Sequence, residues 1–129
     1  MTLVDTSAWV EFLRGTGSAV CQRVDDLLAG DIAVCDPVRM EVLAGARDDA
    51  HLRDLRRLLA RCTAVAMHTT DYDDAAQLYR VCRRNGETPR RLTDCLIAAV
   101  AIRADLPILH ADADFDVLAR SCALVVASS

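Results

Sequence analysis

Three acidic residues of the chain lie within five residues after apolar runs that predict buried strands. Asp5 comes after the run 2–4, and Asp112 and Asp114 come after the run 107–109. In a parallel sheet, ligands bind beyond the carboxyl ends of the strands, so these carboxylates are placed where a ligand is expected. Each also has a structural explanation, as a helix N-cap for Asp5 and as turn residues for the other two.

Two further acids lie on helical segments that are otherwise apolar. Glu41 shares a helix face with Val38 and Val42, and Asp94 leads the apolar stretch 95–102. The helix dipole explains a carboxylate at the start of a helix, but it does not explain burial beside such a stretch. An ionised carboxylate on an apolar face needs a cation or hydrogen bonds, so a functional role is favoured for both residues.

The five acids together predict a metal centre. Carboxylates that lie close together raise each other's pKa, so such a group stays ionised only with cations bound. Oxygen ligands without cysteine indicate Mg²⁺, or Mn²⁺, rather than zinc. Metal ions held by carboxylates suit phosphodiester hydrolysis, in which one ion activates water and another stabilises the leaving oxygen. Two such ions would cancel the formal net charge of −4.

His110 stands two residues before Asp112, which raises the question of a mixed ligand set. A histidine that ends a strand is more often packed or hydrogen-bonded than bound to a metal. We therefore expect His110 to be packed or hydrogen-bonded.

Short apolar runs alternate with helical patterns along the whole chain. Strands are expected at residues 2–4, 32–35, 63–66, 107–109 and 123–127, and helices at 6–14, 18–29, 37–45, 48–61, 71–84, 93–103 and 114–120. Asp36 is expected as the N-cap of the third helix, with Pro37 at its first position. The alternation predicts an α/β fold with three layers, α/β/α, around a short parallel sheet of four or five strands.

The composition is that of an ordinary globular domain. A length of 129 residues suits a single domain over 1–129 with one core. No apolar run approaches the roughly 20 residues that cross a bilayer, and the run 1–4 is too short for a signal-peptide core, so a cytoplasmic location is expected. The six cysteines include no Cys-x-x-Cys pair, which argues against a zinc or redox motif, and we expect them to be reduced.

Every basic residue of the chain is an arginine. Codon bias in a GC-rich genome explains this most simply, although the planar fork of arginine also suits phosphate recognition. Three arginines end one predicted helix and two more precede the next; they are Arg80, Arg83, Arg84, Arg90 and Arg91. A loop over 85–92 would bring Arg84, Arg90 and Arg91 beside the acids, where they could contact RNA phosphates. A solvated basic helix end is the alternative.

Four segments, taken in order, resemble the motifs of PIN-domain ribonucleases. They are Val4-Asp5-Thr6-Ser7-Ala8-Trp9, Glu41, Thr93-Asp94-Cys95-Leu96-Ile97-Ala98-Ala99 and His110-Ala111-Asp112-Ala113-Asp114-Phe115-Asp116. The match covers almost the whole chain and is closest to the short VapC-type toxins of bacterial toxin–antitoxin pairs. The resemblance implies that Asp5 and Asp94 bind the metal, with Glu41 and Asp112 completing an acidic quartet.

The same resemblance implies further catalytic residues, an activity and partners. Asp114 would be an auxiliary acid, and the Ser7 hydroxyl would orient a carboxylate or a metal-bound water. The implied activity is Mg²⁺-dependent endonucleolytic cleavage of RNA, frequently tRNA, which leaves a 3′-hydroxyl and a 5′-phosphate. Members usually form homodimers and are held inactive by a VapB antitoxin whose tail lies across the active-site groove.

Other parallel-sheet proteins also gather aspartates at strand ends. Receiver domains and haloacid-dehalogenase-type phosphatases do so, but both rely on a lysine near the acids, and this chain has none. The phosphatase pattern also requires a second aspartate where this chain has Ser7. The remaining alternatives to a toxin are a housekeeping PIN ribonuclease in RNA processing or decay, and a non-catalytic PIN binding module, against which the intact acids argue.

Overall fold

The computed structural model describes residues 1–128, which contain four strands and seven helices. The elements are β1 (Thr2–Val4), α1 (Thr6–Arg14), α2 (Ala19–Leu27), β2 (Ile32–Cys35), α3 (Asp36–Ala44), α4 (Asp49–Ala60), β3 (Thr63–Val65), α5 (Thr69–Arg84), α6 (Leu92–Arg103), β4 (Ile108–Leu109) and α7 (Ala113–Ser121). Every predicted helix is present, with its ends within two residues of the predicted ones.

The four strands form one parallel sheet in the order β3-β2-β1-β4. Because all pairs are parallel, the carboxyl ends of the strands lie on one edge. The fifth strand predicted at 123–127 is reduced to a single parallel bridge between Ile108 and Val126. The reason is that β4 has only two residues to pair with.

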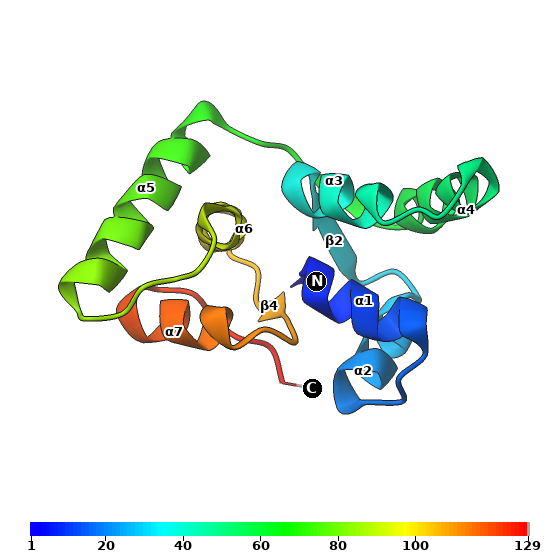
Figure 1. Cartoon of the computed structure of the whole chain (residues 1–129), viewed down its shortest axis with the longest axis horizontal. Helices are drawn as coiled ribbons and strands as arrows, with labels where there is room; N and C mark the ends of the chain where they lie inside the picture. The colour runs from blue at the N-terminus through cyan, green and yellow to red at the C-terminus, as the bar shows by residue number, and fades with distance from the viewer. Residues whose placement is uncertain (129) are drawn as a thin grey trace.

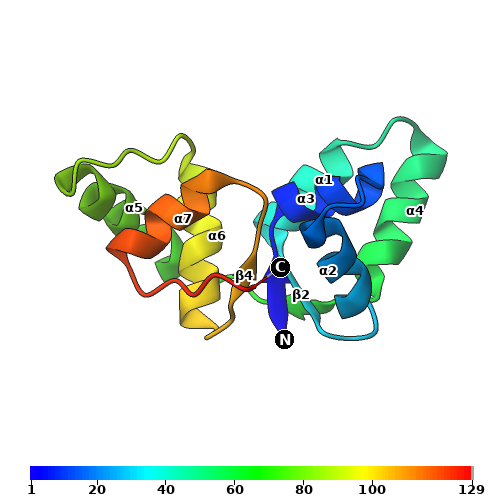
Figure 2. The same cartoon turned by 90° about the horizontal axis from the view of Figure 1, so that it is seen from below.

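Helices cover the sheet on both faces, which confirms the predicted three layers. In Figure 1, α5, α6 and α7 gather on one side of the strands, and α1, α2, α3 and α4 lie on the other. The view from below in Figure 2 shows the same division, with β1 and β4 between the two groups. The chain therefore contributes its first half to one helical layer and its second half to the other.

Buried side chains anchor the helices that begin at the carboxyl edge of the sheet. Trp9 of α1 and Phe115 of α7 are fully buried, and α6 is buried over most of its length, including Ile97 and Val100. These anchors fix the starts of three helices, and four of the five acids singled out in the sequence lie at or next to those starts; the fifth, Glu41, lies within α3.

The start of α3 differs from the prediction. Asp36 is the first helical residue, and Cys35 is the N-cap although its side chain makes no capping hydrogen bond. Cys35 is still extended and paired with Val65 of β3, so the helix begins directly where the strand ends. Pro37 then falls within the first turn, where its missing N–H costs nothing.

The six cysteines are free thiols, as expected. Within residues 1–128, no helix has both the length and the apolar character that a membrane-spanning segment requires.

Candidate metal centre

Asp5 lies between β1 and α1 and is fully buried. Its Oδ2 accepts hydrogen bonds from the backbone N–H of Ser7 at 2.9 Å and from the Ser7 hydroxyl at 2.6 Å, so it caps α1. Its Oδ1 has no hydrogen-bond partner among the described residues. The two interpretations of Asp5 are therefore compatible, since one oxygen caps the helix and the other is available to a ligand.

Ser7 joins the ends of two neighbouring strands. Its hydroxyl donates to Asp5 Oδ2 and accepts a hydrogen bond of 2.9 Å from the backbone N–H of Ala111, in the segment after β4. With both its donor and an acceptor position in use, the hydroxyl holds the Asp5 carboxylate in one orientation.

Asp94 is the third residue of α6 and its side chain is fully buried. Its Oδ1 accepts a hydrogen bond from Arg91 at 3.0 Å, whereas Oδ2 has no partner among the described residues. Burial raises the pKa of Asp94 to about 6, the Arg91 guanidinium opposes that rise, and the Asp5 carboxylate adds to it. Burial also raises the pKa of Asp5, against the hydrogen bonds from Ser7. Two buried carboxylates that repel each other and keep unpartnered oxygens fit a site for a cation.

Glu41 extends from α3 to the same edge of the sheet. Its Oε1 accepts a hydrogen bond of 3.0 Å from the Thr6 hydroxyl, and its Oε2 accepts one of 3.1 Å from Arg91. Consecutive residues at the start of α1 thus contact two acids, because Thr6 binds Glu41 and Ser7 binds Asp5.

Asp112 and Asp114 complete the cluster from the start of α7. Asp112 caps this helix, and Arg90 contacts both residues, with 3.0 Å from Nη2 to Asp112 Oδ1 and 3.1 Å from Nε to Asp114 Oδ2. Asp94, Asp112 and Asp114 each offer one oxygen within 4.8 Å of the others. Carboxylate oxygens at this spacing could hold one divalent ion, given small side-chain adjustments.

The sequence predicted arginines beside the acids but not their ion pairs. Arg90 pairs with Asp112 and Asp114, and Arg91 pairs with Glu41 and Asp94, so the two arginines contact every acid of the set except Asp5. Arg84 makes no ion pair within residues 1–128; with Arg80 and Arg83 it lines a shallow hollow of about 320 Å³ on α5.

His110 is packed and hydrogen-bonded beside the acids, as expected. Its ring lies against Phe115, with 5.3 Å between the ring centroids. Nδ1 accepts a hydrogen bond from the backbone N–H of Asp112, so in the neutral ring Nε2 carries the proton that faces Asp116 Oδ1 at 3.1 Å.

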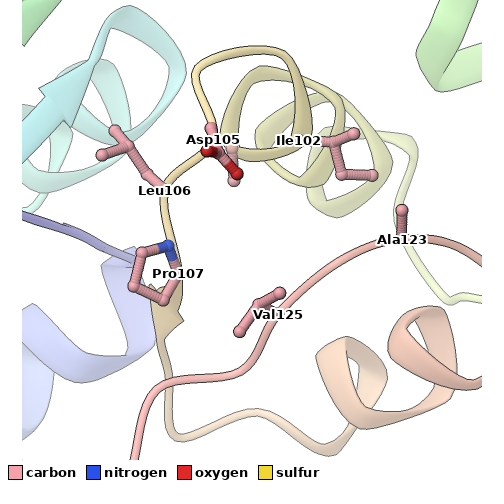
Figure 3. A pocket seen from close by; sticks show the side chains of 7 residues that line it. Ile102, Asp105, Leu106, Pro107, Ala123 and Val125 are labelled. Carbon is pink, nitrogen blue, oxygen red and sulfur yellow. The ribbon is translucent and has the colours of Figure 1, made fainter.

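A groove of about 450 Å³ borders the centre between α1, α3 and α4. It shares Thr6 and Glu41 with the centre, and Arg14 and Arg47 add positive charge to a partly apolar lining. Figure 3 shows a smaller hollow of about 190 Å³ near the opposite end of α6, with an apolar lining apart from Asp105. Of these two hollows, the groove next to Glu41 is the one placed to bring a ligand to the acids.

Comparison with known protein families gives one match over most of the chain. Residues 2–121 match the family model of the PIN domain. The chain is 48% identical to "VapC ribonuclease Mb1587" of Mycobacterium bovis and to "Ribonuclease VapC11" of Mycobacterium tuberculosis. Each alignment covers 99% of this chain and 98% of the relative.

Solved structures show the same fold at low sequence identity. VapBC2 from Rickettsia felis, bound to a DNA fragment from its promoter, matches with a TM-score of 0.78 and 17% identity, over 98% of this chain and 96% of that one. VapBC-1 from nontypeable Haemophilus influenzae matches with a TM-score of 0.77 and 15% identity, over 98% of this chain and 96% of that one. These matches confirm the predicted three-layer fold.

Proposed function

The chain belongs to the PIN-domain family, among the VapC ribonucleases, and from this premise we propose that it is a metal-dependent endoribonuclease acting as the toxin of a toxin–antitoxin pair. The observation that carries the metal dependence is the pair of buried, unpartnered oxygens, Asp5 Oδ1 and Asp94 Oδ2. A buried carboxylate oxygen without a hydrogen bond is costly, and a bound cation removes that cost.

The donor set fits Mg²⁺, or Mn²⁺ in its place, because it consists of carboxylate oxygens. We assign Asp5 and Asp94 as the principal ligands, with Asp112 and Glu41 as the other acids of the metal site. Asp114 supports the site through Arg90, and Ser7 orients the Asp5 carboxylate. The bound ion would supply Lewis acidity and lower the pKa of a water molecule.

The reaction that suits this site is hydrolysis of a phosphodiester bond. The oxygen of water bonds to phosphorus, the bond from phosphorus to the 3′ oxygen breaks, and the proton lost by water ends on that 3′ oxygen. The products carry a 5′-phosphate and a 3′-hydroxyl. The chain's own residues bind and orient the reacting groups.

The surroundings of the centre suit an RNA substrate. Arg90 is 73% exposed and Arg91 is 48% exposed, so both present charge to solvent beside the acids. We propose that these two residues and Arg84 contact RNA phosphates, and that the substrate is a tRNA. The groove next to Glu41, with Arg14 at its wall, offers room for the neighbouring nucleotides.

We further propose a VapB-type antitoxin as the partner, a homodimer as the assembly and the cytoplasm as the location. The solved structures of VapBC complexes, in which a VapC-like chain occurs with its antitoxin, support the partner. An antitoxin segment that fills the groove beside Glu41 would block the approach of RNA to the acids.

The metal-dependent activity is tested on protein freed of metal and then incubated with total RNA and Mg²⁺. Wild type should cleave the RNA, and Asp5→Asn and Asp94→Asn should not. Asp73→Asn is a matched control because this acid is exposed on α5, away from the centre, and it should cleave like wild type. Cleavage that survives both substitutions at the centre would contradict the metal mechanism.

The toxin role is tested by expression in cells. Expression of the chain alone should arrest growth, and co-expression with an antitoxin encoded beside it should relieve the arrest. Harmless expression of a protein that cleaves RNA in vitro would instead favour a housekeeping ribonuclease.

A further inference from the structure

The acidic centre carries two cations of its own, supplied by the adjacent residues Arg90 and Arg91. We propose that the guanidinium of Arg91 takes the place of a second divalent ion, so that the centre binds one metal ion rather than two. This inference rests on the metal-dependent function proposed above and sets the number of bound ions at one.

The position of Arg91 is that of a bridging cation. Its Nη1 lies 3.1 Å from Glu41 Oε2 and its Nη2 lies 3.0 Å from Asp94 Oδ1, so one planar group joins acids from α3 and α6. In two-metal sites the ions lie roughly 3.5–4 Å apart, and each is held by carboxylates. The guanidinium offers the same carboxylates a permanent positive charge, because it does not lose its proton in proteins.

Each oxygen of Glu41 already has a hydrogen-bond donor while Arg91 is in place. Its Oε1 is occupied by the Thr6 hydroxyl and its Oε2 by Arg91. A second ion bound through Glu41 would have to share an oxygen with one of these partners or displace it. The side chain of Glu41 is only 19% exposed, so water would not fully compensate the lost contact.

The unpartnered oxygens are not the ones that Arg91 contacts. Asp5 Oδ1 and Asp94 Oδ2 are both buried and free of hydrogen bonds within the described residues. Asp94 also has a carboxylate oxygen within 4.8 Å of oxygens of Asp112 and Asp114. A single hard cation could therefore collect its ligands without disturbing the contacts of Arg91.

Charge balance agrees with one ion. The five carboxylates of the centre carry five negative charges, and the two guanidinium groups that contact them neutralise two. One divalent ion would leave a single negative charge, and two ions would make the cluster positive. Like charges at this distance repel strongly in a partly buried site, so the second ion would bind against the guanidinium groups.

The backbone also keeps Arg91 in position. It is the N-cap residue of α6, so the helix that carries Asp94 fixes where the Arg91 side chain begins. Its contacts are charge-assisted hydrogen bonds to one fully buried and one mostly buried carboxylate, which are stronger than those of a surface ion pair.

The test counts the Mn²⁺ ions that bind to metal-free protein, by calorimetry and by electron paramagnetic resonance. Wild type should bind one Mn²⁺ and give the spectrum of an isolated ion. Arg91→Gln removes the charge and should bind two ions, with the spectrum of an exchange-coupled pair. Arg91→Lys keeps the charge and should bind one. Arg120→Gln, which alters an exposed ion pair with Glu87, is the matched control and should also bind one.

Two bound ions in wild type or in Arg91→Lys would overturn the inference, and so would a single ion in Arg91→Gln. Arg91→Ala is a second uncharged variant and should repeat the two-ion result, with circular dichroism confirming that each variant is folded. The measurement needs no RNA. Wild type that binds no Mn²⁺ would refute the proposed metal-dependent function together with the inference, whereas wild type that binds two would refute the inference alone.

Discussion

A buried aspartate lies near each end of helix α6: Asp71 of α5 near its last residue, and Asp94 of α6 itself near its first. The surroundings of the two carboxylates differ. Near its last residue, Asp71 of α5 accepts hydrogen bonds of 2.6 and 3.0 Å from Arg103 and one of 2.7 Å from the backbone N–H of His68. Near its first residue, Asp94 accepts one hydrogen bond and keeps a free oxygen. Both side chains are fully buried.

The different surroundings shift the two pKa values in opposite directions. The hydrogen-bonded Arg103 guanidinium lowers the pKa of Asp71, and burial raises the pKa of Asp94 to about 6. A fully satisfied carboxylate stabilises the fold and has no capacity left for a ligand. A buried carboxylate left partly unsatisfied is costly to the fold, and such residues are characteristic of functional sites.

The largest expected difference between the two ends is in activity. Asp94→Asn should lower RNA cleavage by more than about 100-fold, because even residues that only support metal ligands cost about 10–100-fold when changed. The metal-free variant should melt no lower than wild type, since the substitution removes a buried charge. Cleavage rates with Mg²⁺ and melting curves in a chelator check both statements. A large loss of stability would show that Asp94 is instead a structural residue like Asp71.

At the other end of α6 the effect should fall on stability. Arg103→Ala leaves Asp71 buried without its cation and should lower the free energy of unfolding by about 3 kcal/mol. Denaturant titration measures this loss, and Arg103→Lys should lose less because it retains a charge. RNA cleavage per folded molecule should be unchanged. If Arg103→Ala lost RNA cleavage but kept the free energy of unfolding of wild type, the proposed distinction between the two ends of α6 would be wrong.

A smaller effect is expected from acid. Because the folded-state pKa of Asp71 is lowered, its contribution to stability is complete above its unfolded pKa of about 4 and is lost as the pH falls through the folded-state value. The free energy of unfolding of wild type should therefore decrease below about pH 4. Asp71→Asn should be less stable at neutral pH and less sensitive in this range. Parallel profiles for the two proteins would contradict the assignment.

The smallest effect is expected at a surface ion pair. Arg120 contacts Glu87 at 2.9 Å, but the two side chains are 58% and 32% exposed. Arg120→Ala should change the free energy of unfolding by no more than about 0.5 kcal/mol. A change as large as that of Arg103→Ala would show that burial does not govern the difference between these pairs.

Local patterns predicted most of the fold. Helical periodicity, capping residues and turn residues act within a few positions, so the helix ends were predicted to within two residues. The segment 123–127 was predicted as a strand from its apolar residues alone, but strand length depends on the partner, and β4 is too short to pair with all of it. The N-cap at Cys35 likewise depends on its pairing with β3.

The sequence predicts those site residues whose carboxylates lie among apolar residues, where an ionised group is costly. Asp94 and Glu41 stood out for that reason, and the structure brings both to the same edge of the sheet. The contacts of Glu41 could not be predicted, because Thr6 lies 35 residues from it and Arg91, expected only as an RNA contact beside the acids, lies 50 residues from it. Asp71 gave no signal, since its burial depends on Arg103, 32 residues later.

The division of the helices between the two faces of the sheet also determines when the centre can exist. Asp5 and Glu41 come from the half of the chain in one helical layer, and Asp94, Asp112 and Asp114 from the half in the other. During synthesis on the ribosome, the N-terminal layer emerges first with only two of the five acids. The acidic cluster is therefore complete only after residue 114 has left the ribosome and α7 has packed, so a translating ribosome carries no assembled centre before that point.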